Sequence, residues 1–414
     1  MSEAGFLERL LDGAAVEWVP LGEATNYEQP TKYLVKNANY SDKFATPVLT
    51  AGKTFILGKT SEVTGIYEAS KSPTIIFDDF TTANKWVDFD FKAKSSAMKM
   101  ITSSDVGRFS LKYIYYWMNT LPDESVDGDH KRQWISNYCN KALPIPCPEN
   151  PTKSLAIQAE IVRILDAFTE LTAELTAELT AELGARKKQY KHYRDQLLSF
   201  EGGDVEWKPL DEIGEFIRGK RFTKADYVDE GISAIHYGEI YTHYGTFATE
   251  TLSKVRPALK DSLRYAQKGD VIVTGVSETV EDVGKALAWL GDEKVAIHDD
   301  SYAFRHGMNP KFIAYALQTD AFQEQKAQYV SSGKMKRLLI DGIKKVKLPV
   351  PYPNDPEKSL AEQARIVAIL DRFDTLTSSL SEGLPREIAL RQKQYAYYRD
   401  LLLNFPKPAE VAEA

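Results

Sequence analysis

Apolar residues recur at helical spacing in two segments of the 414-residue chain, 151–203 and 354–406. Successive apolar positions are three or four residues apart, which places them on one face of a helix. Each segment is predicted to form a helix of about 70 Å at 1.5 Å per residue. Because each has one apolar stripe, we expect the two helices to pack on each other as an antiparallel coiled coil. The stripes consist of Ile161, Leu165, Phe168 and Leu171, and of Ile366, Leu370, Phe373 and Leu376.

A four-residue motif, TAEL, occurs three times in succession at 172–183. Its leucines, Leu175, Leu179 and Leu183, continue from Leu171 as a stripe that turns slowly around the helix. These residues favour helix, so the array is interpreted as a helical spacer. One added repeat would lengthen the helix by roughly 6 Å and rotate its end by about 40°. DNA turns by roughly 35° per base pair, so one repeat corresponds in angle to about one base pair.

Two other segments alternate short apolar runs with turn residues, at 16–150 and 204–353. Each of these two heads is expected to be a mixed α/β domain, which makes the whole chain an α+β protein with two heads joined by two long helices. Strands are predicted at 73–77, 85–91, 270–276 and 294–300, and helices at 113–121 and 312–325.

The helical segments are copies of each other. SLAIQAEIVRILDAF from Ser154 matches SLAEQARIVAILDRF from Ser359, and RKKQY from Arg186 matches RQKQY from Arg391, all at an offset of 205 residues. Ser359 and Glu362 have the spacing of a capping box at the start of the second helix. The repeat indicates that the two helical segments, 151–203 and 354–406, form one frame that carries the two heads.

The heads share only short matches. Both begin with Val-Glu-Trp and end in a proline run, LPIPCP or LPVPYP. Two weaker echoes are PVLTAG (47–52) with SAIHYG (233–238), and IFDD (76–79) with IHDD (297–300). The predicted order is an N-terminal helix at 1–15 that completes a circular repeat, a first head at 16–150, a central helix at 151–203, a second head at 204–353, a C-terminal helix at 354–406 and a tail at 407–414.

Composition bounds the class of protein. The chain is 43% hydrophobic and 27% charged, which is ordinary for a folded soluble protein. It lacks an apolar run long enough for a membrane span and an N-terminal signal peptide, and Cys139 and Cys147 fit neither a disulfide framework nor a zinc site. These features favour a cytoplasmic protein. The net charge of −7 disfavours a lone DNA-binding domain and suggests that partners supply positive surface.

Searches for catalytic motifs give no candidate. AGKT (51–54) and LGKT (57–60) lack the glycine that a phosphate loop needs four residues before its Gly-Lys pair. The sequence also lacks GxGxxG, GxSxG, HExxH and the Asn-Pro-Pro-aromatic motif. Asp78–Asp79 and His298–Asp300 follow apolar runs, where turn formation is favoured over metal binding. No catalytic residue, metal or cofactor is therefore expected in this chain.

Basic residues cluster in loops of both heads, where arginine and lysine suit guanine edges and phosphates. The basic loop 218–224 contains a glycine that would let the backbone approach a phosphate closely. The candidate DNA contacts are Lys53, Lys59, Lys94, Lys99, His130, Lys131 and Arg132 in the first head, and Arg218, Lys220, Arg221, Lys224, His236, Tyr237, Lys334, Lys336 and Arg337 in the second.

The repeated frame, the TAEL array and the paired Val-Glu-Trp starts together resemble the specificity (S) subunits of type I restriction–modification systems, in particular the TAEL-repeat, type IC-like subfamily. The resemblance implies that each head is a target recognition domain that reads one half of a split, asymmetric site in double-stranded DNA. The helices would set the spacer length and dock two modification (methyltransferase) subunits.

The resemblance also implies that catalysis belongs to partners. Modification subunits would bind S-adenosylmethionine and methylate adenine, and restriction subunits would bind ATP and Mg²⁺ and cut unmodified DNA. Such a chain would be cytoplasmic and bound to the bacterial nucleoid through DNA. Two alternatives stay open. A self-contained DNA-modifying enzyme would bind cofactor by itself, and a coiled-coil scaffold would show no salt-dependent DNA binding.

Overall fold

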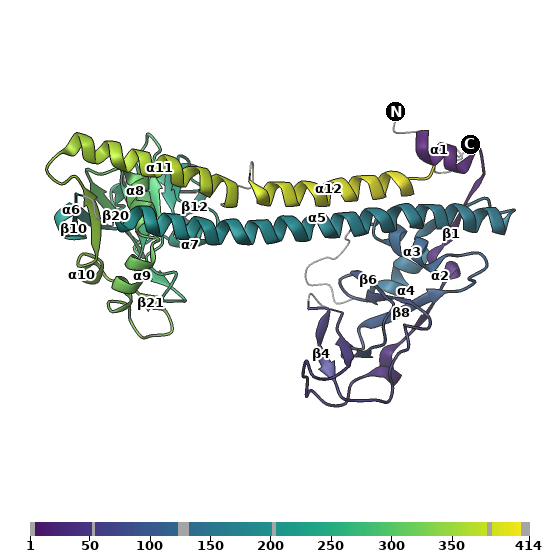
Figure 1. The fold of residues 1–414 in the computed structure, drawn as a ribbon. Helices are drawn as coiled ribbons and strands as arrows, with labels where there is room; N and C mark the ends of the chain where they lie inside the picture. The colour runs from purple at the N-terminus through teal and green to yellow at the C-terminus, as the bar shows by residue number, and fades with distance from the viewer. Residues whose placement is uncertain (1–4, 52–53, 123–131, 201–203, 379–382, 407–414) are drawn as a thin grey trace. The chain divides into compact units, whose positions relative to one another are not determined.

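The computed structural model describes residues 5–51, 54–122, 132–200, 204–378 and 383–406. The chain forms two compact units, one made of Met1–Thr176 with Leu390–Ala414 and the other of Ala177–Ala389. Each unit contains one head together with parts of the long helices (Figure 1).

The described part of the first head contains three small sheets. Its strands are β1 (Val16–Pro20), β2 (Thr25–Glu28), β3 (Thr46–Leu49), β4 (Ile56–Thr60), β5 (Thr74–Asp78), β6 (Asn84–Val87), β7 (Lys92–Ala93), β8 (Met98–Ser103) and β9 (Ala142–Pro146). β1 pairs with β9, an antiparallel sheet has the order β2-β8-β5-β6, and a third sheet has the order β4-β3-β7 with β3 and β7 parallel. Its helical elements are α1 (Gly5–Leu11), α2 (Leu21–Ala24), η1 (Pro30–Tyr33), α3 (Leu111–Met118), α4 (Gln133–Ser136) and η2 (Tyr138–Asn140).

The second head also consists of small sheets and short helical elements. Its strands are β10 (Val205–Pro209), β11 (Gly214–Arg218), β12 (Tyr227–Ile235), β13 (Phe247–Ala248), β14 (Ser253–Val255), β15 (Tyr265–Ala266), β16 (Val271–Thr274), β17 (Val276–Ser277), β18 (Ala286–Trp289), β19 (Val295–Ile297), β20 (Ser301–His306), β21 (Lys336–Arg337) and β22 (Lys347–Pro351). Its helical elements are α6 (Leu210–Ile213), η3 (Lys224–Asp226), α7 (Tyr237–Thr242), η4 (Pro257–Leu259), α8 (Pro310–Ala316), α9 (Asp320–Ala327) and α10 (Ile340–Ile343). Its sheets have the orders β10-β22, β11-β20-β16-β18-β13, β14-β12-β19-β15 and β17-β21.

The two heads share one strand arrangement. The order β2-β8-β5-β6 corresponds to β11-β20-β16-β18, and β4-β3-β7 corresponds to β14-β12-β19, with the same parallel pair in the second sheet. The echo between 47–52 and 233–238 is confirmed, because these segments include the ends of the equivalent strands β3 and β12. The echo between 76–79 and 297–300 is wrong, since β5 corresponds to β16 and β19 corresponds to β7. A short acidic motif recurs easily without common ancestry.

The predicted strands at 73–77 and 270–276 are present as β5 and as β16 with β17. Those at 85–91 and 294–300 are present only in part, since β6 ends at Val87 and β19 ends at Ile297. The predicted helix at 312–325 is two helices, α8 and α9. The break occurs because the Thr319 hydroxyl accepts a hydrogen bond from the Phe322 amide and caps a new helix there.

Each head is closed by a two-stranded ladder between its first and last strands. Trp18 lies opposite Pro144 in the first head, and Trp207 lies opposite Pro349 in the second. The Val-Glu-Trp starts and the proline runs are therefore repeated because they pair with each other. Proline is tolerated here because a two-stranded ladder leaves one side of each strand without a partner strand.

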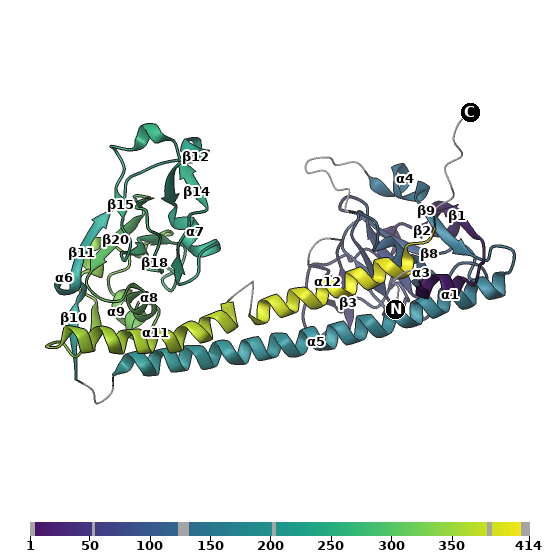
Figure 2. The same cartoon turned by 90° about the horizontal axis from the view of Figure 1, so that it is seen from above.

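The central frame segment is one helix, α5 (Pro151–Ser199), whereas the second copy is described as two, α11 (Pro356–Ser378) and α12 (Leu384–Leu403). The second copy has no TAEL array, and Pro385 in the first turn of α12 suits a helix start. Within the first unit Phe168 of α5 stacks on Tyr398 of α12, with ring centroids 5.5 Å apart. Within the second unit Tyr193 of α5 stacks on Phe373 of α11 at 5.6 Å. Figure 2 shows the ribbons of α5 and α11 side by side in this unit.

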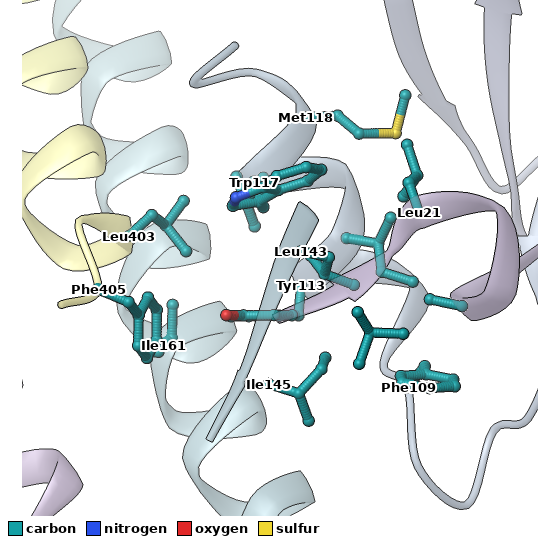
Figure 3. Packing of buried hydrophobic residues seen from close by; sticks show 14 of the residues in the cluster. Leu21, Phe109, Tyr113, Trp117, Met118, Leu143, Ile145, Ile161, Leu403 and Phe405 are labelled. Atoms are coloured by element: carbon teal, nitrogen blue, oxygen red, sulfur yellow. The ribbon is translucent and has the colours of Figure 1, made fainter. Parts of the chain in front are cut away.

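The first positions of each apolar stripe pack on a head, whereas Phe168 and Phe373 make the expected contact between the long helices. Ile161 and Leu165 are fully buried in the core of the first head, with Tyr113 and Trp117 of α3. Figure 3 shows Leu403 and Phe405, from the end of the other frame segment, beside Ile161 in this cluster. In the second unit, Ile366 and Leu370 are buried in a core with Phe312 and Tyr315 of α8 and Leu198 of α5.

The outer positions of the stripes differ from the prediction. Leu171 is 50% exposed and Leu376 is 37% exposed. The three TAEL leucines, Leu175, Leu179 and Leu183, are half-buried. The apolar stripe therefore continues in sequence beyond its buried positions.

A buried glutamine joins each frame helix to its head. Gln158 Oε1 accepts a hydrogen bond from Ser110 N at 2.8 Å, and its Nε2 donates to Arg108 O at 2.9 Å. Gln363, 205 residues later, accepts from Asn309 N at 2.8 Å. Ser110 and Asn309 are the N-caps of α3 and α8. The glutamine of the frame thus holds the start of the head helix that packs on it.

A carboxylate further along each frame helix makes a second joint with the same head helix. Asp166 accepts from Tyr116 Oη at 2.5 Å and pairs with Lys112 Nζ at 2.9 Å. Asp371 makes the same contacts, at 2.7 Å to Tyr315 Oη and at 2.5 Å to Lys311 Nζ. Sequence reasoning missed this joint, although the Lys-x-x-x-Tyr spacing is repeated in both heads.

The proposed capping box at Ser359 and Glu362 is wrong. Ser359 is buried inside α11, where its hydroxyl accepts from Gln363 Nε2 at 3.0 Å. The side chain of Asp355 accepts from Lys358 N at 3.0 Å and caps the helix instead. Glu362 forms an ion pair with Arg365.

No helix in the described parts of the chain is both long enough and apolar enough to cross a membrane.

Replacing Gln158 with leucine is expected to lower the free energy of unfolding by about 1–3 kcal/mol, because the half-buried Ser110 N and Arg108 O would lose their hydrogen-bond partner. Urea unfolding of the chain would measure the change. The control is Gln196→Leu, at an exposed position of the same helix, where a change of at most about 0.5 kcal/mol is expected. Equal effects of the two substitutions would refute a structural role for the buried amide.

Candidate nucleic-acid interface

Several strand ends meet at one edge of the second head, which we term the strand-end edge. β11, β12, β16 and β19 all finish there, and the turn His298–Asp300 leads from β19 into β20. His298 N donates to Ile235 O at the end of β12, and Gly275 N, just after β16, donates to Asp300 O. The turn therefore ties both sheets together at this edge.

Glycine at position 219 is required by packing at this edge. A Cβ atom there would lie 2.1 Å from His298 O and 2.4 Å from Ile297 O. Both clashes are with backbone atoms, so any other residue would force the backbone to move. Gly219 N also donates to Ser301 O at 3.0 Å. The glycine was predicted to admit a phosphate, but the structure gives it a different role, the close approach of β11 to the turn.

Two arginines converge on the turn from different segments. Arg218 donates from Nε to Asp299 O at 3.0 Å, and Arg337 Nη1 lies 3.5 Å from Asp300 Oδ1. Both side chains are exposed. The structure therefore brings together residues 119 positions apart that sequence analysis selected separately. The acidic turn aims their guanidinium groups along one edge, leaving them at the surface.

An aromatic group lies beside the arginines. The rings of His236 and His298 are 4.5 Å apart, and those of His236 and Tyr237 are also 4.5 Å apart. Phe222 packs edge-on against His298 at 5.1 Å. Sequence analysis selected His236 and Tyr237 but missed Phe222 and placed His298 only as a turn residue. The missing signal was the pairing of β12 with β19, which no local pattern reveals.

His236 is a neutral group at this edge. Burial, followed by the neighbouring His298, lowers the pKa of His236 to about 4. Its Nδ1 accepts from Gly238 N at 3.1 Å and caps α7. A neutral imidazole with an engaged Nδ1 can offer its Nε2–H as a donor but cannot pair with a phosphate as a cation.

The turn His298–Asp300 places possible metal ligands within 4.8 Å of one another. Nδ1 of His298 already accepts from Asp300 N at 3.2 Å, which is the turn role expected from sequence. Asp78 has a similar local role in the first head, where its Oδ1 accepts from Phe80 N at 2.9 Å.

The first head has an equivalent strand-end edge, formed where β2, β3, β5 and β7 finish. Lys94 is exposed directly after β7, and its backbone N donates to Leu49 O, as His298 N donates to Ile235 O. Arg132 is exposed and its Nη1 lies 3.8 Å from Asp79 Oδ2. Arg132 corresponds to Arg337. In both heads the backbone amide of the residue after the arginine donates to the carbonyl of the residue after a strand, which is Asp79 after β5 and Gly275 after β16.

Lys99 is not available at the surface. Its side chain is 1% exposed and forms an ion pair with the equally buried Asp79 at 3.3 Å. An unpaired charge at this depth would be costly, so the pair holds the end of β5 against β8. Lys99 is therefore withdrawn as a DNA contact.

The other candidates are distributed as follows. Lys59 lies opposite Pro47, at the start of β3 and thus at the far end from the strand-end edge. Lys53, His130 and Lys131 lie outside the described residues. Lys220, Arg221, Lys224 and Lys334 are exposed in the second head, and Lys336 is half-buried in β21.

The lowered pKa of His236 makes the second unit sensitive to acid. Between pH 6.5 and about 4 the unfolded chain binds a proton that the folded chain excludes, so stability falls as the pH falls through this window. His236→Asn keeps a side-chain acceptor at the N-cap but removes the titration. Between pH 6.5 and 4.5 the melting temperature of the variant is expected to fall less than that of the wild type.

Part of the acid sensitivity should remain in this variant, since burial also lowers the pKa of His306 to about 4. Thermal unfolding followed by circular dichroism measures both profiles. Identical pH profiles for variant and wild type would contradict the assignment to His236.

Comparison with known proteins places this fold in one family. A family model described as type I restriction modification DNA specificity domain matches residues 203–390. The chain is 52% identical to the type I restriction enzyme EcoR124I/EcoR124II specificity subunit of Escherichia coli, and the match covers 100% of both chains. It is also 30% identical to the EcoprrI specificity subunit of Escherichia coli, over 92% of this chain and 93% of that one.

A solved structure shows a similar fold at low identity. It belongs to work described as "Structural basis underlying complex assembly and conformational transition of the type I R-M system", and it matches 94% of this chain and 97% of its own with a TM-score of 0.60 and 16% identity. With identity and coverage this high against the Escherichia coli subunits, the chain belongs to the specificity subunits of type I restriction–modification systems.

Proposed function

We propose that each head reads one half of a split, asymmetric target in double-stranded DNA through its strand-end edge. The observation that carries this proposal is that two heads of one topology present different residues at the same edge. Arg337 has its counterpart in Arg132, whereas the aromatic group around His236 and His298 is replaced by Lys94 and its neighbours. One docking geometry with two different sets of base contacts would recognise two different short sequences.

The charge of the chain fits a shared DNA-binding surface. The net charge is −7, and acids at the strand-end edge, Asp79 and Asp300, lie next to its arginines. Counterion release by this chain alone would be modest, since it depends on the number of phosphates that cations neutralise. Partner subunits would then supply much of the affinity for the backbone, and this chain would supply specificity.

The proposed contacts in the second head are Arg218, Lys220, Arg221, Lys224 and Arg337, which are exposed around the strand-end edge or in its adjoining loops. His236 and Tyr237 would contact bases as neutral groups. In the first head Lys94 and Arg132 are the exposed candidates. Lys53, His130, Lys131, Lys334 and Lys336 remain predictions from the sequence.

The frame helices would act as the spacer and the docking surface. α5 is helical through the whole TAEL array, which supports the assignment to the TAEL-repeat subfamily and a dependence of DNA spacing on repeat number. Large apolar side chains are exposed along the frame, as expected for a surface that binds partner subunits. They are Leu171, Tyr193, Leu360, Leu376, Leu390, Tyr397 and Tyr398.

The partners would perform the chemistry. Two modification (methyltransferase) subunits would bind S-adenosylmethionine and methylate adenine in each half-target, and restriction subunits would use ATP and Mg²⁺ to cleave unmodified DNA. Such a complex would act in the cytoplasm, on the bacterial nucleoid.

Deleting one TAEL repeat is expected to keep both half-targets and shorten the gap between them by about one base pair, because the helix end rotates by about 40°. Adenine-methylation mapping of DNA from cells that express the chain with its modification subunit reads out both features. The control, Glu174→Gln with Glu178→Gln, keeps the helix length and should keep the gap. A gap that ignores the deletion, or methylation without a split target, would overturn the proposal.

Arg337→Ala is expected to weaken binding of the assembled complex to its target about 10- to 100-fold, through loss of a base contact, and to relax one position of the second half-target. If Arg337 contacts phosphate, the target would stay the same and the salt slope of log K would fall by about 1. Gel-shift titrations at several salt concentrations separate these cases.

The matched control for Arg337 is Lys268→Ala. Lys268 is an exposed cation paired with Asp292, and it precedes β16 at the end opposite Thr274. It should leave affinity and target unchanged. An Arg337→Ala complex that binds like the control would remove this edge from the proposed interface.

A further inference from the structure

The first part of each head has the same length and the same elements. Residues 16–29 and 205–218 each contain a strand, a one-turn helix and a second strand, at a constant offset of 189 residues. This offset places Gln29, directly after β2, at the position of Arg218, the last residue of β11. It also places Tyr33 at the position of Phe222, so an aromatic residue follows at the same distance in both heads.

The strand registers support this equivalence independently. Met98 lies opposite Asp78, and the preceding Ala97 O accepts from Asp79 N. Ser301 lies opposite Thr274, and the preceding Asp300 O accepts from Gly275 N. Met98 and Ser301 are therefore equivalent.

One position further along the same strands, Lys99 is equivalent to Tyr302. Arg218 lies opposite Tyr302, and Gln29 is one residue beyond the Glu28–Met100 pair, which brings it level with Lys99. Sequence offset and hydrogen-bond register thus place Gln29 and Arg218 at one point of the strand-end edge.

Gln29 is exposed, and its side chain does not cap the 3-10 helix η1 that it precedes. Pro30, which follows it, is buried and fixes the backbone at this point. Arg218 is also exposed, with Nε held by Asp299 O. A short, anchored backbone therefore presents an amide in the first head where it presents a guanidinium in the second.

We propose that Gln29 reads an adenine in the first half-target at the place where Arg218 reads a guanine in the second. This inference rests on the proposed function of the strand-end edge. A glutamine amide can donate to adenine N7 and accept from adenine N6, and an arginine can donate to guanine N7 and O6. The two side chains are the complementary readers of the two purines, placed on one scaffold.

The test exchanges the side chains at positions 29 and 218 in the complex of this chain with its modification subunit. Gln29→Arg is expected to change one adenine of the first half-target to guanine in methylation maps, while the second half-target and the gap stay the same. Arg218→Gln should change one guanine of the second half-target to adenine. Gln29→Ala should accept any base at that position, with discrimination reduced about 10- to 100-fold.

The matched control is Asn26→Ala, an exposed amide in β2 three residues before Gln29, which should leave both half-targets unchanged. The unchanged second half-target in the Gln29 variants shows that the protein has folded and assembled. A Gln29→Ala complex that keeps the wild-type first half-target overturns the assignment of Gln29. Failure of the proposed function is distinguishable, because the wild-type complex itself would then give no split target.

Discussion

The position of each head depends on a few polar contacts buried under the head helix. Gln158 and Gln363 each hold the N-cap of the helix that packs on the frame, and Asp166 and Asp371 hold a tyrosine in the last turn of that helix. An apolar contact alone would allow α3 or α8 to slide or rotate, since hydrophobic burial has little directional preference. Hydrogen bonds from an amide and a carboxylate on one helix face fix both position and angle. The same device occurs in both units at an offset of 205 residues along the frame.

The sequence predicted the architecture because its signals are local or repeated. The periodicity of the frame, the Val-Glu-Trp starts and the proline runs each reflect contacts that both halves make. The partners of the apolar stripe could not be predicted, since Ile161 and Leu165 look the same whether they face a second helix or a head. The short acidic echo at 76–79 and 297–300 misled for a related reason. A match of a few residues carries no information about which strands are neighbours.

The candidate site was predictable only in part. Arginines such as Arg218 and Arg337 stand out in sequence because they lie in loops rich in basic residues and glycine. Lys99 stood out in the same way, but it is buried in an ion pair with Asp79. Gln29 had no signal of its own, because a single glutamine before a proline is unremarkable by composition. Its equivalence to Arg218 lies in the register of β2 against β8 and of β11 against β20.

The ladders that close the heads have an evolutionary consequence. β1 with β9, and β10 with β22, bring the start and the end of each head side by side. The frame therefore meets the same two-stranded stem whatever lies between its strands. A gene exchange with both crossover points in these stems would replace a whole head and leave the helices and their length untouched, and the new head would supply its own contacts to Gln158 and Asp166 or to Gln363 and Asp371. New combinations of heads would thus arise in one recombination event.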